Sequence, residues 1–223
     1  MTAIKSLRSI PFLLTLVLSL TLTSCRDTTP EHQPETTRPA PAMVQPVMSS
    51  PEIDVPLTDE SLYQIGVTWS DQNGRSVQLA SLRGKPVVIS MVFTRCAWAC
   101  PMIVQDMKKI AARLPDDVKD RVHYVLVTLD PARDTPDVLA EFARTHHLDA
   151  TQWTLLRGTA SDVRLLAALL GTRYREEANG QFSHTNMISI LNEEGEIVHV
   201  QEGLGSDPTG SVDKLRNLFA ANS

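Results

Sequence analysis

The chain contains 223 residues, of which 42% are hydrophobic and 21% charged, and its formal net charge is −5. This composition fits one globular domain with appendages and excludes collagen-like, long-coil and wholly disordered proteins. Because there is no basic excess to neutralise phosphates, we expect no nucleic-acid partner.

The N-terminal residues predict export. Lys5 and Arg8 precede an uncharged apolar run at residues 10–22, which is shorter than the roughly 20 residues that a membrane-spanning helix needs. The run ends in Leu-Thr-Ser followed by Cys25, which resembles a bacterial lipoprotein cleavage box. We therefore predict a lipoprotein signal peptide at residues 1–24 and lipidation of Cys25, with an uncleaved anchor as the alternative. The expected location is the cell envelope, as a membrane-anchored lipoprotein with its domain on the periplasmic or extracytoplasmic side.

Residues 25–56 hold half of the 14 prolines of the chain, interspersed with Thr, Glu and Gln. Such a segment buries too little apolar surface to offset its ordering entropy, so it predicts a Pro-rich disordered tether. An N-terminal extension without a role is the alternative. Residues 57–223 are then expected to form one folded domain.

Strand-like and helix-like patterns alternate through this domain. An Asn-Gly pair at residues 73–74 predicts a β-hairpin turn, and the apolar run at residues 86–93 predicts a strand buried on both faces. The expected elements, in chain order, are a hairpin of residues 63–69 and 75–79, a strand at 86–93, a helix at 101–114, a strand at 122–129, a helix through about His146 capped by Thr135, a helix capped by Ser161 that ends at Gly171, a hairpin of 188–191 and 197–200, and a helix at 212–219. This order predicts an α/β fold: a thioredoxin-like mixed sheet with flanking helices and an N-terminal β-hairpin.

Two cysteines remain once Cys25 is assigned to the lipid. Cys96 and Cys100 form a C-x-x-x-C pattern where a predicted strand ends and a predicted helix begins. The partial positive charge of a helix N-terminus stabilises thiolates, and positions i and i+4 lie on one side of a helical turn. Two thiolates are a soft, half-built metal site, which favours copper(I) with zinc as a competitor.

Other roles for Cys96 and Cys100 stay open at this point. The pair could be catalytic, as a dithiol–disulfide exchange centre. A structural disulfide would close a very short loop and constrain the unfolded chain little. A peroxidase role fits poorly, because the residues before each cysteine lack the usual Thr or Ser and Pro.

A third metal ligand is sought among the six histidines. His184 lies in a predicted loop at residues 181–186, which in a thioredoxin-like fold faces the cysteine turn. General dithiol oxidoreductases of that fold keep a cis-proline here, whereas this loop has no proline. An imidazole opposite two thiolates completes a Cys₂His set, with an ordinary polar loop residue as the alternative.

These motifs together resemble the Sco/SenC family of copper-binding, thioredoxin-fold proteins for cytochrome c oxidase assembly. The resemblance covers residues 65–204 and rests on Phe93-Thr94-x-Cys96-x-x-x-Cys100-Pro101, on Asp130-Pro131-Ala132-Arg133-Asp134-Thr135-Pro136, and on His184. It implies copper bound by Cys96, Cys100 and His184. It also implies delivery to, or preparation of, the copper site of the copper-bearing subunit of cytochrome c oxidase or of another copper protein. The alternative is a thiol-disulfide oxidoreductase that reduces the copper-ligand cysteines of the partner.

The chain departs from the family pattern at two positions. Ala97 replaces a proline after the first cysteine, and Ser183 replaces an acidic residue before the histidine. The second change removes an oxygen ligand or hydrogen-bond acceptor, for which water or Asp130 is a hypothetical substitute. Trp98, between the cysteines, is either a hydrophobic cover, a docking contact or an inward-packed side chain.

Overall fold

The computed structural model describes residues 56–220. The predicted signal peptide, the lipidated Cys25 and all of the tether except its last residue lie outside the described residues. No helix within residues 56–220 combines the length and the apolar character that a bilayer crossing needs.

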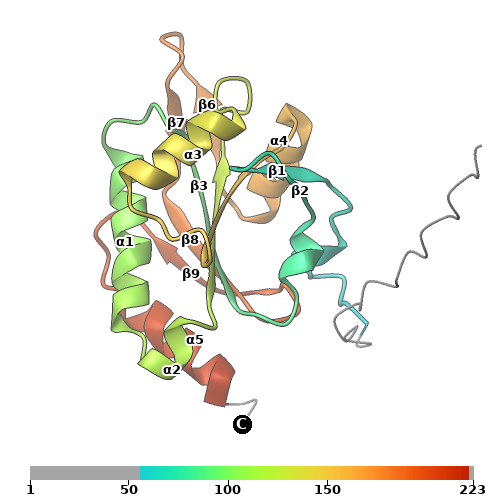
Figure 1. Ribbon diagram of the computed structural model, residues 1–223, viewed down its shortest axis with the longest axis vertical. Helices are drawn as coiled ribbons and strands as arrows, with labels where there is room; N and C mark the ends of the chain where they lie inside the picture. The colour runs from blue at the N-terminus through green and yellow to red at the C-terminus, as the bar shows by residue number, and fades with distance from the viewer. Residues whose placement is uncertain (1–55, 221–223) are drawn as a thin grey trace, which may run out of the picture. The chain divides into compact units, whose positions relative to one another are not determined.

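Seven strands form one mixed sheet (Figure 1). Their order across the sheet is β2 (Ser76–Val77), β1 (Trp69–Asp71), β5 (Trp153–Arg157), β4 (His123–Thr128), β3 (Val87–Val92), β8 (Met187–Leu191) and β9 (Ile197–Glu202). The β3–β4 and β4–β5 pairs are parallel, and every other pair in this sheet is antiparallel. A separate two-stranded sheet pairs β6 (Tyr174–Glu176) with β7 (Phe182–His184).

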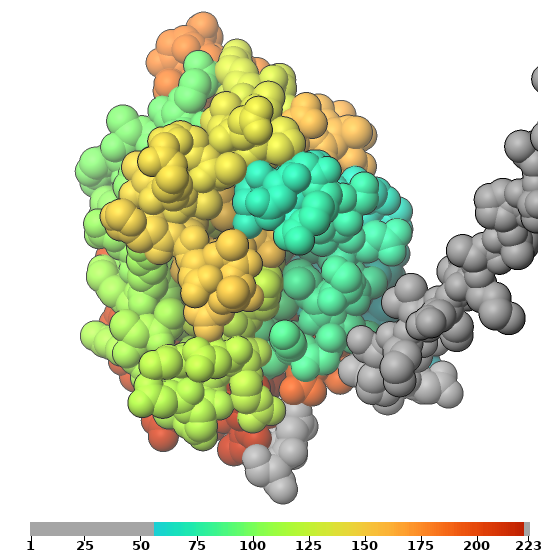
Figure 2. All heavy atoms as spheres, in the orientation of Figure 1, coloured from blue at the N-terminus to red at the C-terminus, as the bar shows by residue number. Residues whose placement is uncertain are grey.

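Helical segments precede, connect and follow the strands. They are η1 (Leu62–Gln64), η2 (Leu79–Leu82), α1 (Ala99–Arg113), α2 (Asp116–Lys119), α3 (Pro136–Thr145), α4 (Ala160–Leu169) and α5 (Thr209–Ala220). Because parallel crossovers are right-handed, α1 and α3 lie on the same face of the sheet, and α5 packs against α1 (Figure 1). On the near face of Figure 2, α3 lies beside the N-terminal hairpin, since α3 packs on β5 and β1 pairs with β5.

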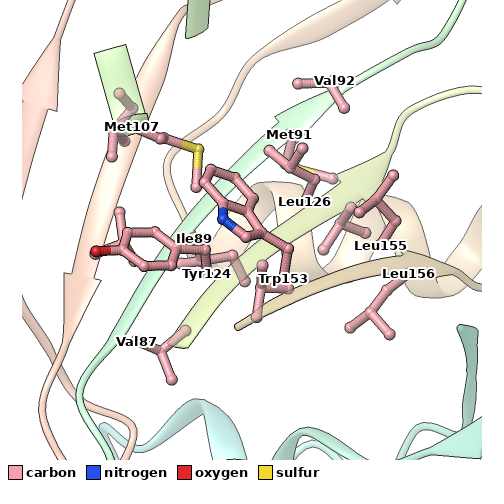
Figure 3. Close-up of a cluster of buried hydrophobic side chains, with 14 of the residues drawn as sticks. Val87, Ile89, Met91, Val92, Met107, Tyr124, Leu126, Trp153, Leu155 and Leu156 are labelled. Atoms are coloured by element: carbon pink, nitrogen blue, oxygen red, sulfur yellow. The ribbon is translucent and has the colours of Figure 1, made fainter. Parts of the chain in front are cut away.

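The hydrophobic core is centred on β3, whose six residues are all buried. Side chains of β4, β5 and α1 complete the cluster, including the stacked rings of Tyr124 and Trp153, whose centroids are 4.7 Å apart (Figure 3). A buried strand of β-branched residues fixes the central register, because every side chain is held on one face or the other. This rigid strand leads directly into the cysteine loop.

The predicted fold class is confirmed. The mixed sheet, the flanking helices, the hairpin turn at residues 73–74 and the hairpin of β8 and β9 are all present. Thr135 caps α3 as predicted, because its side chain accepts a hydrogen bond from the N–H of Val138.

Several predicted boundaries were wrong for local reasons. Residues 62–64 form a 3₁₀ turn capped by Ser61, so the first strand begins only at Trp69. Helix α4 is capped by Thr159 in a capping box with Asp162, not by Ser161.

Three further features departed from the prediction. Helix α1 begins at Ala99, two residues earlier than predicted, and so includes Cys100. Strand β5 was missed, because the alternation of Trp, Thr, Leu and Arg at residues 153–157 is short. The predicted loop at residues 181–186 contains β7, which pairs with the unpredicted β6.

Candidate metal and thiol site

The two cysteines lie at the junction of β3 and α1. Cys96 is half-buried in the connecting loop, whereas Cys100 is the second residue of α1 and is 0% exposed. Both are free thiols, and the backbone N–H of Cys100 lies 3.3 Å from the sulfur of Cys96, to which it donates. The N–H of Phe93 donates to the Cys100 sulfur at 3.4 Å. The N–H of Cys100 thus connects the Cys96 sulfur to the first turn of α1, and the N–H of Phe93 connects the Cys100 sulfur to the end of β3.

His184 ends β7 and faces Cys100. Its Nε2 lies 3.9 Å from the Cys100 sulfur, and its Nδ1 lies 3.1 Å from the carbonyl oxygen of Thr185. Because a carbonyl oxygen only accepts, Nδ1 carries the proton and the lone pair of Nε2 points to the sulfur. Metal-binding histidines are commonly oriented by such a backbone acceptor.

The separation of these two donor atoms suits a shared metal ion. In zinc sites the metal lies about 2.3 Å from sulfur and about 2.0 Å from nitrogen. A sulfur and a nitrogen that bind one such ion can therefore lie at most about 4.3 Å apart, when they are on opposite sides of it. The 3.9 Å between Cys100 and His184 falls inside this limit. Within residues 56–220, however, no three His, Cys, Asp or Glu side chains form a ready metal cluster. Cys100 contacts Cys96 through its N–H and His184 through its sulfur. The complete set of three ligands stays a prediction.

Burial controls the protonation of both facing groups. It raises the pKa of the Cys100 thiol, the N–H of Phe93 opposes this, and the neighbouring Cys96 sulfur and, to a smaller extent, Asp134 add to it. The helix N-terminus, expected to favour the thiolate, is therefore outweighed at Cys100. Burial lowers the pKa of His184, opposed by its bond to Thr185, so the imidazole is neutral at neutral pH.

Aromatic rings connect the histidine strand to the cysteine loop. Phe93 packs edge-on against Phe182, with centroids 5.3 Å apart, and against the ring of His184 at 6.0 Å. Phe93 is buried at the end of β3, so it carries the rigidity of the sheet to the hairpin. Phe182 is two residues before His184, a position that the sequence reasoning did not consider.

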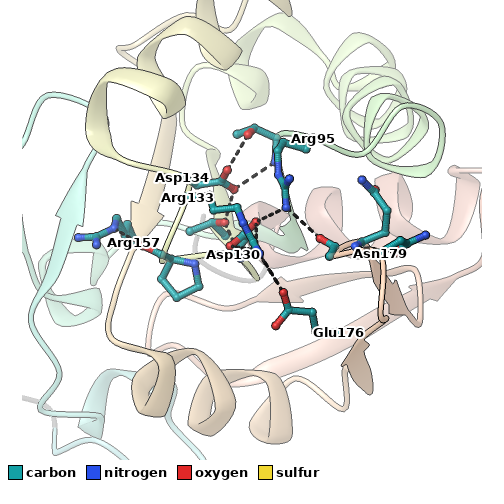
Figure 4. A network of polar contacts seen from close by, with 12 residues as sticks. Arg95, Asp130, Arg133, Asp134, Arg157, Glu176 and Asn179 are labelled. Atoms are coloured by element: carbon teal, nitrogen blue, oxygen red, sulfur yellow. Dashed lines mark hydrogen bonds and ion pairs between the residues drawn. The ribbon is translucent and has the colours of Figure 1, made fainter.

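Asp134 fixes the start of the cysteine loop. Its carboxylate accepts bonds from the N–H of Thr94 at 3.1 Å, from the Thr94 hydroxyl at 2.6 Å and from the Thr128 hydroxyl (Figure 4). The side chain is buried, so these bonds satisfy a carboxylate that would otherwise be costly. Because Thr135 and not Asp134 caps α3, the Asp134 carboxylate makes these bonds beside the thiol site.

Asp130 is the centre of a neighbouring ionic network (Figure 4). Arg95 bonds one of its oxygens at 3.2 Å, and Arg133 bonds both at 3.1 Å. Arg95 also donates to the carbonyl of Gly180 at 2.9 Å, and Arg133 contacts Glu176 at 3.2 Å. The hypothesis that Asp130 replaces the missing oxygen ligand is therefore disfavoured, because two guanidinium groups already occupy its oxygens.

Trp98 projects from the molecule. Its side chain is 69% exposed, so it is not packed inward, and Ala97 beside it is exposed as well. Ser183 is also exposed. The two positions that depart from the family pattern therefore lie on the surface around the donor atoms rather than in the core.

Comparisons with known proteins identify the family of the chain. A family model described as SCO1/SenC matches residues 59–220. A curated protein of Stutzerimonas stutzeri, provisionally named a copper-binding protein, is 26% identical over 131 residues. That alignment covers 57% of this chain and 63% of the relative, so the chain spans less than two thirds of that relative's length.

Solved structures share the fold. Yeast Sco1 with copper bound has a TM-score of 0.59 and 23% identity, covering 70% of this chain and 87% of that one. BsSco, described as a member of the Sco family of cytochrome c oxidase assembly proteins, has a TM-score of 0.59 and 23% identity, covering 69% and 90%.

Proposed function

The chain belongs to the SCO1/SenC family, and from that premise we propose that it binds copper through Cys96, Cys100 and His184. The copper is then delivered to, or used in preparing, the copper site of cytochrome c oxidase. The observation that carries this proposal is the 3.9 Å separation between His184 Nε2 and the Cys100 sulfur.

The chemistry of the donor set supports copper as the cargo. Two thiolates and a neutral imidazole are the soft and intermediate ligands that copper(I) prefers. Cys100 is buried and His184 half-buried, which limits the access of water to a bound ion. Cys96 is less buried than Cys100, so it is the donor through which an incoming partner exchanges ligands.

The names of related structures point the same way. Yeast Sco1 was solved with copper bound, and BsSco is described among cytochrome c oxidase assembly proteins. The partner proposed for this chain is therefore the copper-bearing subunit of such an oxidase, or another copper protein with a similar acceptor site.

A thiol-disulfide oxidoreductase is the second candidate. The supporting observation is that Cys96 is the more accessible thiol and receives the N–H of Cys100. In this reaction the Cys96 thiolate attacks a disulfide of the partner and forms a mixed disulfide. Cys100 then displaces the partner thiolate, leaving a Cys96–Cys100 disulfide and two reduced cysteines on the partner. The raised pKa of Cys100 is unfavourable for its role as the second nucleophile.

The His184→Ala variant separates the two candidates. His184 is a ligand in copper transfer but has no obligatory role in thiol exchange. We expect the variant to lose both copper binding and the ability to load an apo copper-acceptor domain, measured by the acceptor's copper absorption. A variant that lost copper yet kept full activity on the partner would refute copper transfer and favour the reductase.

Anchoring at the cell envelope is also a proposal, and it is based on the pattern of residues 1–25. Lipid on Cys25, followed by a Pro-rich tether, would hold the domain on the extracytoplasmic side of the membrane. We expect labelled fatty acid to be incorporated into the wild-type chain and not into Cys25→Ser. Equal labelling of both would contradict lipidation at Cys25.

A further inference from the structure

A cavity of about 800 Å³ lies beside the thiol site, between the loop at residues 129–133, helix α4 and the β6–β7 hairpin. Its volume is within the range of small-molecule and peptide side-chain sites. The apolar part of its lining includes Leu129, Val163, Ala167 and Phe182. Phe182 also packs on Phe93, so the cavity shares a wall with the cysteine loop.

Four arginines line this cavity: Arg133, Arg164, Arg173 and Arg175. Arg133 is paired with Asp130 and Glu176, and Arg175 is paired with Glu177. Arg164 and Arg173 have no ion pair with any acidic side chain in the described part of the chain, residues 56–220. In a chain of net charge −5, this is a local positive surface.

The positive surface continues to the histidine. A second hollow of about 320 Å³ is lined by both Arg173 and Arg175 together with Ser183 and His184. Strand β6 thus borders the larger cavity and also the hollow that opens on the imidazole. An extended chain segment seated in the cavity would place its next residues at the copper donors.

We propose that this arginine-rimmed cavity holds an acidic segment of the copper-accepting partner, a proposal that rests on the copper-transfer function above. Carboxylates of the segment pair with the guanidinium groups of Arg164 and Arg173, which present a planar, bidentate donor geometry. Apolar side chains between the carboxylates cover the floor around Phe182. An inorganic anion would pair with the guanidinium groups but would leave the apolar lining of the cavity exposed to water. A peptide with both acidic and apolar side chains is therefore the better match.

The test uses the copper-free full chain and a fluorescent synthetic peptide in which Asp alternates with Leu. We expect saturable binding by anisotropy that weakens with salt, and a loss of about tenfold in the Arg164→Gln/Arg173→Gln variant. Both arginines are exposed, so the variant is expected to fold, as checked by circular dichroism. The charge-matched control is Arg144→Gln/Arg216→Gln, which changes two exposed arginines that do not line the cavity.

Four results would overturn the proposal. They are absence of saturable binding, equal binding of a peptide with Asn in place of Asp, an equal loss in the control variant, and displacement of the peptide by the same concentration of inorganic phosphate. A Cu(I) titration of the wild-type chain is run in parallel and reports on the proposed function alone. Copper binding without peptide binding refutes only the docking site, and peptide binding without copper binding refutes only the copper role.

Discussion

Cys100 and His184 face each other across 3.9 Å, yet different parts of the protein hold them. Cys100 is fully buried in the first turn of α1, against the central strand β3. His184 ends one strand of a two-stranded hairpin that is not part of the main sheet. The hairpin is attached through the Phe182–Phe93 contact, the Arg133–Glu176 pair and the bond from Arg95 to Gly180.

This difference indicates how the site can bind and release an ion. The cysteine side is as rigid as the core, because moving Cys100 would disturb buried strand and helix packing. The histidine side is attached through fewer contacts, which are the half-buried Phe182 ring on Phe93 and polar bonds at the surface, so its position can change without unfolding the domain. Affinity and release can thus be adjusted at the hairpin while the thiols stay in place.

The largest effect is expected from the cysteines. Replacing either Cys96 or Cys100 with serine removes a soft ligand, so Cu(I) affinity should fall by several powers of ten in competition with a chelator. The Cys25→Ser variant is the matched control, since the same exchange lies outside the proposed ligand set. Unchanged affinity in Cys100→Ser would refute the ligand set.

The pH dependence of binding should distinguish the two sides. Burial holds the pKa of Cys100 above its usual range, so at neutral pH copper must displace a proton from this thiol. Affinity should therefore rise with pH, by about tenfold per unit for one thiol. The pKa of His184 is lowered, so the imidazole is already neutral and adds no slope above pH 7. A Cu(I) affinity that stays flat between pH 7 and 8 would contradict the protonated thiol.

Loosening the hairpin should weaken copper without unfolding the protein. Phe182→Ala removes the ring that holds β7 on Phe93, and we expect about a tenfold loss of Cu(I) affinity with little change in the free energy of unfolding. Phe142→Ala, in the buried face of α3, should do the reverse, with a loss of about 3 kcal/mol of stability and unchanged affinity below the unfolding temperature. If each variant lost both Cu(I) affinity and stability, copper binding could not be separated from the stability of the domain.

The smallest effect on affinity is expected from Trp98. Its side chain is exposed and holds no donor atom, so Trp98→Ala should leave Cu(I) affinity unchanged. As an exposed aromatic group beside Cys96, it is expected to contact the partner, and the rate of copper transfer to an acceptor domain should fall. Stopped-flow transfer at the wild-type rate would remove Trp98 from the docking surface.

The same contrast explains what the sequence could predict. The cysteine side could be predicted from the sequence, because the apolar run of β3 and the C-x-x-x-C spacing are local signals. The histidine side could be predicted only in part. The position of His184 opposite the cysteines followed from the predicted fold, but the β6–β7 hairpin did not. Its strands are three residues each and contain no fully buried residue, so they are too short and too open for a period-two pattern to stand out in the sequence.

The polar contacts around the site also lay beyond sequence reasoning. Asp134 belongs to one of the family motifs, but only the tertiary structure shows that its carboxylate bonds Thr94. The pairing of Arg95 with Asp130 joins residues from two separate loops and has no sequence signature. Burial at Cys100 likewise depended on α1 beginning earlier than its sequence pattern indicated.

The most direct test is a titration of the reduced Cys25→Ser chain with Cu(I) against a competing chelator, beside the same chain carrying His184→Ala. The account predicts tight one-to-one binding by the first protein and an affinity at least about a hundredfold lower in the second, equivalent to a loss of about 2.7 kcal/mol. Weak binding that is the same with and without His184 would contradict the copper site and leave a dithiol centre.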